Sequence, residues 1–265
     1  MSKELLIKGG YVVTVDPDLG DLPAGDVLVA DGLITAVGPD LKPTTTAAEV
    51  IEAAGRLVIP GMVDTHRHVW QGAIGGYTPQ ITGAGYGPAV LTGISLKYSP
   101  EDVYAGTMWG ALQALDAGIT TIADWAHNDQ SPAHADADLR GLRDSGIRGY
   151  FLYGGPGPAT GDPDPPHPAD ARRMRAQYFA SGHLEDEIGT LTPGKQADIA
   201  VIDMRSPHLD GFGDPVAVTV LGAGPADVET VIVGGDVVKR DGKLAGDHVD
   251  RALELMHATR EHLRA

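Results

Sequence analysis

Residues 58–68 read Val-Ile-Pro-Gly-Met-Val-Asp-Thr-His-Arg-His, and this stretch decides how the rest of the chain is interpreted. An apolar run ends at Pro60-Gly61, a second short apolar piece follows, and two histidines then come with one residue between them. Residues i and i+2 of a β-strand point to the same face, so His66 and His68 can direct two imidazoles at one point. This spacing is how a strand presents a metal-binding pair. A structural role is the alternative for two isolated histidines.

The composition is that of a globular protein. A length of 265 residues allows one large domain or two modest ones, and 42% hydrophobic with 21% charged residues excludes a disordered chain. The absence of cysteine excludes disulfides, thiolate metal sites and a cysteine nucleophile, and makes a cytoplasmic protein the simplest expectation. The first residues lack the features of a signal peptide, and no apolar run is long enough to span a bilayer.

The charge balance limits the classes of molecule that the protein is expected to bind. The chain has 36 acidic and 20 basic residues, for a net charge of −16 at pH 7. Such a surface repels nucleic acid and anionic membranes. Aromatic residues make up only 5% of the chain, so a platform on which bases stack is not expected. We therefore expect neither a nucleic-acid nor a membrane partner, and a small neutral or cationic substrate fits better.

Both ends of the chain are predicted to be rich in β-hairpins. Asp31-Gly32 and Gly234-Gly235 each lie between apolar runs, which is a strong hairpin signal. The two Gly-Gly pairs, at 9–10 and 234–235, have similar surroundings, so the ends are expected to share one sheet system. The predicted strands are 5–7, 11–15, 26–30, 33–37, 197–202, 216–221, 228–233 and 236–240, and a helix is predicted over 247–265.

The middle of the chain alternates between strand and helix patterns. Alternation of this kind is typical of a parallel sheet or a barrel. A stretch rich in Gly, Pro and Thr over 72–93 is predicted to be a long loop, which in such folds often lines a site. The predicted helices are 100–117, 136–144 and 169–179, and the predicted strands are 119–124 and 148–152.

Three blocks together resemble the amidohydrolase superfamily of metal-dependent hydrolases. The first is 58–68, the second is Ala-Gly-Ile-Thr-Thr-Ile-Ala-Asp at 117–124, and the third is Ile-Gly-Thr-Leu-Thr-Pro-Gly-Lys-Gln-Ala-Asp-Ile-Ala-Val-Ile-Asp at 188–203. His66, His68 and Gln71 form H-x-H-x-x-Q, which is similar to the chlorohydrolase and aminohydrolase branch acting on triazines, nucleobases and similar rings.

The resemblance implies an α/β protein with a (β/α)8 TIM-like barrel beside a β-sandwich formed by both chain termini. It places residues 1–59 and 189–265 in the composite β-sandwich domain and residues 60–188 in the barrel domain. A complete barrel takes about 250 residues, so 60–188 provide a partial barrel only. We expect that strands four to eight are absent between Ser181 and Gly182.

The resemblance also implies the roles of individual residues. His66 and His68 are expected to bind the metal, whereas no residue of this chain matches the family's further histidines and its aspartate. Gln71 and His127 are expected to contact the substrate, with ordinary loop residues as the alternative.

Two acidic residues are expected to support the ligands without touching the metal. They are Asp64, which shares strand parity with both histidines, and Asp124, at the end of the strand predicted over 119–124. For Asp64, a strand-end cap is the alternative.

The leading interpretation is a metal-dependent hydrolase that breaks C–N or C–Cl bonds of a small cyclic substrate, for example by deaminating a nucleobase-like or triazine-like ring. Zinc is the expected metal, with iron as the alternative, and a homo-oligomer is expected. The competing interpretation is a truncated, catalytically inactive remnant that acts as a binding or oligomer-forming protein. A third is that the residues are parts of a longer chain, which an intact mass far above 27.6 kDa would show.

Overall fold

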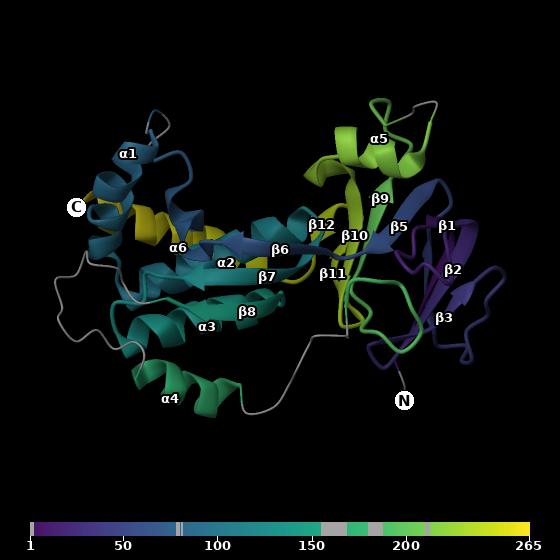
Figure 1. Cartoon of the computed structure of the whole chain (residues 1–265), viewed down its shortest axis with the longest axis horizontal. Helices are drawn as coiled ribbons and strands as arrows, with labels where there is room; N and C mark the ends of the chain where they lie inside the picture. The colour runs from purple at the N-terminus through teal and green to yellow at the C-terminus, as the bar shows by residue number, and fades with distance from the viewer. Residues whose placement is uncertain (1–2, 78–79, 81, 155–168, 180–187, 210–212) are drawn as a thin grey trace. The chain divides into compact units, whose positions relative to one another are not determined.

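The structure is a computed structural model that describes residues 3–77, 80, 82–154, 169–179, 188–209 and 213–265 (Figure 1). The chain divides into two compact units, each described by itself. The first contains Met1–Val63, Ala114–Thr121 and Leu184–Ala245. The second contains Asp64–Gln113, Ile122–His183 and Gly246–Ala265.

In the described part of the first unit, hydrogen bonds join nine strands into one sheet to which both halves of the chain contribute (Figure 1). Their order is β12-β11-β10-β9-β5-β1-β2-β3, and β4 pairs with β1 off this path. The strands are β1 (Glu4–Val12), β2 (Leu22–Ala30), β3 (Leu33–Gly38), β4 (Glu49–Glu52), β5 (Arg56–Pro60), β9 (Ile199–Asp203), β10 (Val228–Val233), β11 (Asp236–Arg240) and β12 (Lys243–Leu244).

The two hairpins predicted at the chain ends are confirmed. Asp31 and Gly32 have φ values of 50° and 84°, and the flanking residues Ala30 and Leu33 pair directly across the turn. Two successive positive φ values match the right-handed twist of the strands on either side of a two-residue turn. Gly234-Gly235 makes the same kind of turn between β10 and β11, with φ values of 54° and 80°.

The core of the first unit lies against this sheet. Alternate residues of the strands supply it, because successive side chains of a strand point to opposite faces. Its fully buried members include Leu5, Ile7, Val58, Val201 and Ile232, which come from both halves of the chain. Burial of this much aliphatic surface from distant segments is what holds the two halves in one unit.

Two local predictions for the first unit are wrong. The predicted strand over 216–221 is instead helix α5 (Pro215–Gly222). The Asp214 side chain accepts a hydrogen bond from the Val216 amide at 2.9 Å, and a proline at the first helical position favours a helix start over the β-branched residues' strand preference. The predicted break at Gly9-Gly10 is also absent, because β1 continues through an irregularity between Ile7 and Gly10.

The second unit is built mainly of helices, with the strand order β6-β7-β8 in its sheet. The strands are β6 (Met62–Arg67), β7 (Ile119–Ala126) and β8 (Arg148–Tyr153). The helices are η1 (Val69–Ile74), α1 (Gly83–Tyr86), η2 (Gly87–Leu91), η3 (Ile94–Lys97), α2 (Pro100–Asp116), α3 (Pro132–Ser145), α4 (Ala169–Tyr178) and α6 (His248–Arg264). The longer predicted helices and the two predicted strands are confirmed. The predicted loop over 72–93 is wrong in part, since short helical turns occupy much of it.

Two clusters of buried side chains form the core of the second unit. One joins Trp70 and Tyr98 to Met256 and Leu263 of α6, so the last helix packs on the segment around η1 and η3. Trp70 and Tyr98 meet edge to face with ring centroids 5.0 Å apart. The other cluster joins α3 to Met174 of α4. These contacts fix the elements that carry the predicted site.

The mixed α/β class expected from the sequence is confirmed. The junction predicted between Ser181 and Gly182 lies outside the described residues. A search of the described part of the chain finds no helix with the length and apolar character needed to cross a bilayer.

A candidate metal and substrate site

The Pro-Gly step of the 58–68 motif has a steric explanation. The Gly61 amide donates a hydrogen bond to the Asp198 carbonyl at 2.8 Å, which joins the chain just after β5 to the residue before β9. A Cβ atom on Gly61 would overlap the side chain of Thr120. The motif therefore needs glycine here because the backbone passes directly over β7.

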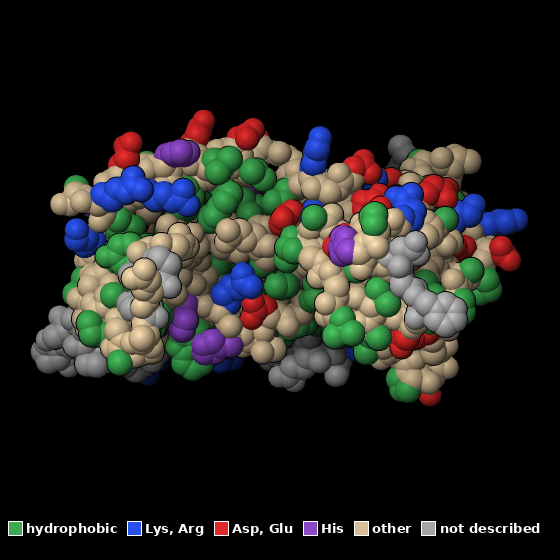
Figure 2. All heavy atoms as spheres, turned by 90° about the horizontal axis from the view of Figure 1, so that it is seen from above, with side chains coloured by type: hydrophobic (Ala, Val, Ile, Leu, Met, Phe, Trp, Pro, Cys, Tyr) green, Lys and Arg blue, Asp and Glu red, His purple; other side chains and the backbone are tan. Residues whose placement is uncertain are grey.

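The two motif histidines lie next to each other, as their spacing predicts. His66 lies in β6 and His68 directly follows the last residue of that strand. Their ring centroids are 5.1 Å apart and nearly perpendicular, and the Trp125 ring lies 5.0 Å from His66. In Figure 2, histidine side chains reach the surface beside one another on the face shown. The strand end thus presents two imidazoles to the same region.

A third imidazole joins the pair at the end of β7. The ring centroids of His68 and His127 are 4.2 Å apart. The Trp125 carbonyl oxygen faces Nδ1 of His68 at 3.1 Å and Nδ1 of His127 at 3.2 Å. A carbonyl only accepts, so both Nδ1 atoms must donate. Each Nε2 is then left with a free lone pair, which is the form of histidine that binds a metal.

The electrostatics keep these imidazoles neutral. Burial lowers the pKa of His68, and the hydrogen bond to Trp125 opposes that effect only in part. Burial and the neighbouring His68 lower the pKa of His127 to about 4. Neutral imidazole is required for metal binding, so His68 and His127 are in the binding form at neutral pH.

Gln71 lies on η1, which is held very close to α2. Its Nε2 donates to the Tyr86 hydroxyl, so the side chain already has a partner on α1. Cβ atoms on Gly106 and Gly110 of α2 would press against the backbone carbonyls of Trp70 and Val69. Two glycines one helical turn apart therefore let η1 approach α2, which fixes the backbone that follows His68.

The two predicted supporting carboxylates act on the backbone of the motif. Asp64 accepts hydrogen bonds from Arg67 Nε at 2.7 Å and from the His66 amide at 3.2 Å. Asp124 is fully buried in β7, and its Oδ1 accepts from the Val69 amide at 3.2 Å. Among the hydrogen bonds of the described residues, neither carboxylate bonds an imidazole ring.

The described residues fit zinc in donor type and fall short in number. Imidazole nitrogens are donors that zinc prefers, but a catalytic zinc takes three protein ligands and water. Within the residues that the structure describes, no group of three or more His, Asp or Glu side chains is arranged to hold a metal ion. His66 and His68 could therefore provide two of the protein ligands that a catalytic zinc takes, which is an incomplete set.

Sequence reasoning missed three residues of this region. Trp125 orients two imidazoles through its backbone carbonyl, a role that carries no side-chain signal. Asp129 and Asp138 are fully buried, although acidic residues in a helix or loop usually face solvent. The only sequence signal for Asp138 is its place among small apolar residues of α3, and that pattern alone does not reveal burial.

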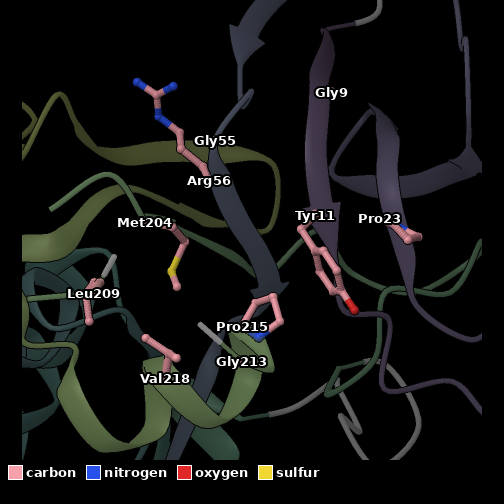
Figure 3. A pocket seen from close by; sticks show the side chains of 10 residues that line it. All are labelled: Gly9, Tyr11, Pro23, Gly55, Arg56, Met204, Leu209, Gly213, Pro215 and Val218. Carbon is pink, nitrogen blue, oxygen red and sulfur yellow. The ribbon is translucent and has the colours of Figure 1, made fainter. Parts of the chain in front are cut away.

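A pocket of about 270 Å³ lies in the first unit (Figure 3). None of the predicted site residues lines it. Arg56 is the charged residue among those lining it. Its guanidinium already forms a bidentate ion pair with Glu229, at 2.5 and 2.7 Å, and its side chain extends away from Met204 and Val218 (Figure 3). Apart from the Tyr11 hydroxyl, the other lining residues are apolar or glycine, so we assign no chemistry to this pocket.

Comparisons with known proteins add to this geometry. Residues 57–183 match the model of the Amidohydrolase family. The 5'-deoxyadenosine deaminase of Methanosarcina barkeri (strain Fusaro / DSM 804) is 32% identical over 151 residues, which are 57% of this chain and 33% of that protein. The matched region thus spans about a third of the length of this curated relative.

Two solved structures share the fold. The atrazine chlorohydrolase of Arthrobacter aurescens TC1, complexed with zinc, has a TM-score of 0.74 at 16% identity, covering 96% of this chain and 99% of that one. An adenosine deaminase of Xanthomonas campestris with bound zinc has a TM-score of 0.76 at 14% identity, covering 99% of each chain. At these identities the likeness shows the fold alone.

Proposed function

Because residues 57–183 match the model of the Amidohydrolase family, we propose that the chain is a metal-dependent hydrolase. The bond it breaks is a C–N or C–Cl bond of a small cyclic substrate. The observation that supports this most directly is the pair of histidines at the end of β6, of which His68 has its Nε2 lone pair free. When bound, a divalent metal provides a nucleophile by lowering the pKa of a bound water to about 7.

The metal we propose is zinc, with iron as the alternative, and His66 and His68 are its proposed ligands. Support comes from the neutral state of the half-buried His68 imidazole and from the zinc present in both solved neighbours. His127 lies against His68 and is the proposed substrate contact at the end of β7, together with Gln71 of η1. Asp64 and Asp124 hold the backbone of the motif at His66 and Val69.

The proposed substrate is a flat nitrogen heterocycle with an amino group or a halogen on a ring carbon. Relatives named as deaminases of adenosine derivatives and a neighbour named as an atrazine chlorohydrolase support this choice. Adenine and triazine rings both contain an N–C–N edge whose ring nitrogens accept hydrogen bonds. An amide such as that of Gln71 can both donate to and accept from such an edge.

We propose for the architecture a partial (β/α)8 barrel over residues 60–188 and a composite domain of residues 1–59 and 189–265 that corresponds to a terminal β-sandwich. The alternation from β6 to α4 and the mixing of both chain halves in one sheet support these assignments. A homo-oligomer and a cytoplasmic location also stay predictions.

A second candidate function is that of an inactive remnant that binds a ligand or a partner. The observation that favours it is the ligand count, because no three His, Asp or Glu side chains among the described residues are arranged to hold a metal, whereas a catalytic zinc takes three protein ligands. The two candidates differ in one measurable property, since a remnant of this kind turns over no substrate.

The test combines metal analysis with an activity assay. Protein purified with zinc present should contain about one zinc per chain, and the double variant His66→Ala/His68→Ala should contain none. The matched control is His257→Ala, which removes an exposed histidine of α6 and should leave the zinc content unchanged. Ammonia release from 5'-deoxyadenosine separates the hydrolase from the remnant, and a chain without bound divalent metal would overturn both the metal site and the hydrolase.

A further inference from the structure

Two carboxyl groups are buried against each other behind the motif. Asp124 of β7 and Asp138 of α3 are both 0% exposed, and the charge of Asp138 acts on Asp124. Oδ2 of each has no donor among the described groups. Two ionised carboxylates only accept, so the two Oδ2 atoms can be satisfied by each other only if one of the two residues holds a proton.

The surroundings decide which residue holds that proton. Burial raises the pKa of Asp124, and the charge of Asp138 raises it further. Burial also raises the pKa of Asp138, but hydrogen bonds from Thr107 and from Asp124 lower it. The Thr107 hydroxyl donates to Asp138 and stabilises its ionised form, so the proton belongs on Asp124.

The remaining oxygens connect this pair to the motif. Asp138 Oδ1 accepts from the Thr107 hydroxyl of α2, and Asp124 Oδ1 accepts from the Val69 amide at 3.2 Å. Val69 is the first residue of η1, so its amide has no acceptor within the helix. The side chain of His68, at the N-cap, does not accept a hydrogen bond from the first turn either. We propose that Asp124 and Asp138 are positioning residues that share one proton and clamp the backbone directly after His68 to α2 and α3.

The other charged groups described near the pair do not offset its negative charge, so a proton is what reduces that charge. Asp129, in the segment after β7, is 0% exposed with both oxygens unpartnered, and burial raises its pKa. Asp136 of α3 and Asp170 of α4 are both bonded by Arg173, at 2.9 and 2.5 Å. Arg173 is therefore already engaged by two other carboxylates.

The test is the hydrogen-exchange protection of the Val69 amide, measured by NMR on metal-free protein across pH. In the wild type, protection should fall as the pH rises and Asp124 loses its proton. Asp124→Asn puts an amide N–H in place of the acid O–H, so it should keep the protection and abolish its pH dependence. Asp124→Ala removes the acceptor, and Asp138→Ala removes its partner, so each should lower the protection about tenfold.

The Val103 amide of α2, bonded to the Ser99 carbonyl at 3.1 Å, is the reference within each variant. If an alanine variant loses protection at Val103 as well, it has unfolded and says nothing of the clamp. The Asp124→Asn variant then provides the test of the proposal. Protection in Asp124→Asn as low as in an alanine variant, or wild-type protection without pH dependence, overturns the proposal. The consequence for His68 rests on the proposed function, but the exchange measurement does not, so a chain that binds no metal can still confirm the clamp.

Discussion

At Gly61, a single missing side chain allows the motif strand to leave the large sheet. Since a Cβ atom would overlap Thr120, Gly61→Ala must displace either the backbone or β7. We expect the free energy of unfolding to fall by about 1–3 kcal/mol, as for other overpacked buried positions. Urea denaturation followed by circular dichroism measures this change.

Gly38→Ala is the matched control, because a Cβ atom there meets nothing within 4 Å. Gly38 lies at the end of β3 and also has no left-handed φ, so its substitution should change the unfolding free energy by less than about 0.5 kcal/mol. Equal effects of the two substitutions would contradict the steric account of the Pro-Gly step.

At the scale of elements, the start of α2 is tied to the end of the chain. Asp102 accepts from the Ser99 amide at 2.9 Å, from the Ser99 hydroxyl at 2.7 Å and from His262 Nδ1 of α6 at 2.6 Å. Burial raises the pKa of Asp102, but these hydrogen bonds and one from Thr259 outweigh burial and lower it. The ionised carboxylate is therefore the form that the folded protein stabilises.

The lowered pKa fixes the sign of a pH effect. The stabilisation by Asp102 is present above the unfolded-state value of 3.8 and is lost as the pH falls through the folded-state value. Asp102→Asn should thus be less stable than the wild type at neutral pH, with the difference shrinking under acid. Urea unfolding at several pH values measures this, with Glu101→Gln, an exposed neighbour, as control. A difference that stays constant down to acid pH would contradict it.

Sequence patterns predicted the elements that local residues determine. Asp31-Gly32 and Gly234-Gly235 specify their turns through backbone conformation, and the H-x-H spacing specifies a shared direction for two side chains. The segment 216–221 was misread because Asp214 and Pro215, just before it, outweigh its own strand preference.

The predicted site was only partly visible from the sequence for a related reason. The pairing of Asp124 with Asp138 joins residues on different elements, and the contact of His68 with His127 depends on how η1 and β7 pack. Such contacts depend on tertiary packing, and the residue pattern of a single strand or helix does not predict them.

At the scale of the whole molecule, the smaller sheet leaves apolar surface uncovered. Among the described residues β6 and β8 pair with β7 alone, and Trp125 and Leu152 are 44% and 39% exposed. Unpaired strand edges beside apolar side chains favour association. We expect light scattering to give a mass that is a multiple of 27.6 kDa, and Leu152→Lys to shift it toward the single chain.

The control for this prediction is Val220→Lys in α5, which adds the same charge at a residue that is 78% exposed in the first unit. It should leave the mass unchanged. A wild-type protein that is monodisperse at 27.6 kDa would contradict the expected oligomer.

The pairing of β5 with β9 determines when, during synthesis, the large sheet can be completed. Arg56 lies opposite Asp203, and none of the described residues between these two strands forms a strand of the large sheet, so one edge of β5 stays without its partner until β9 has been synthesised. A nascent chain thus carries this unpaired edge while the residues between Pro60 and Ile199 are being made. Closing so long a loop is slow, and chaperone capture of that exposed edge would govern the yield of folded protein in a cell.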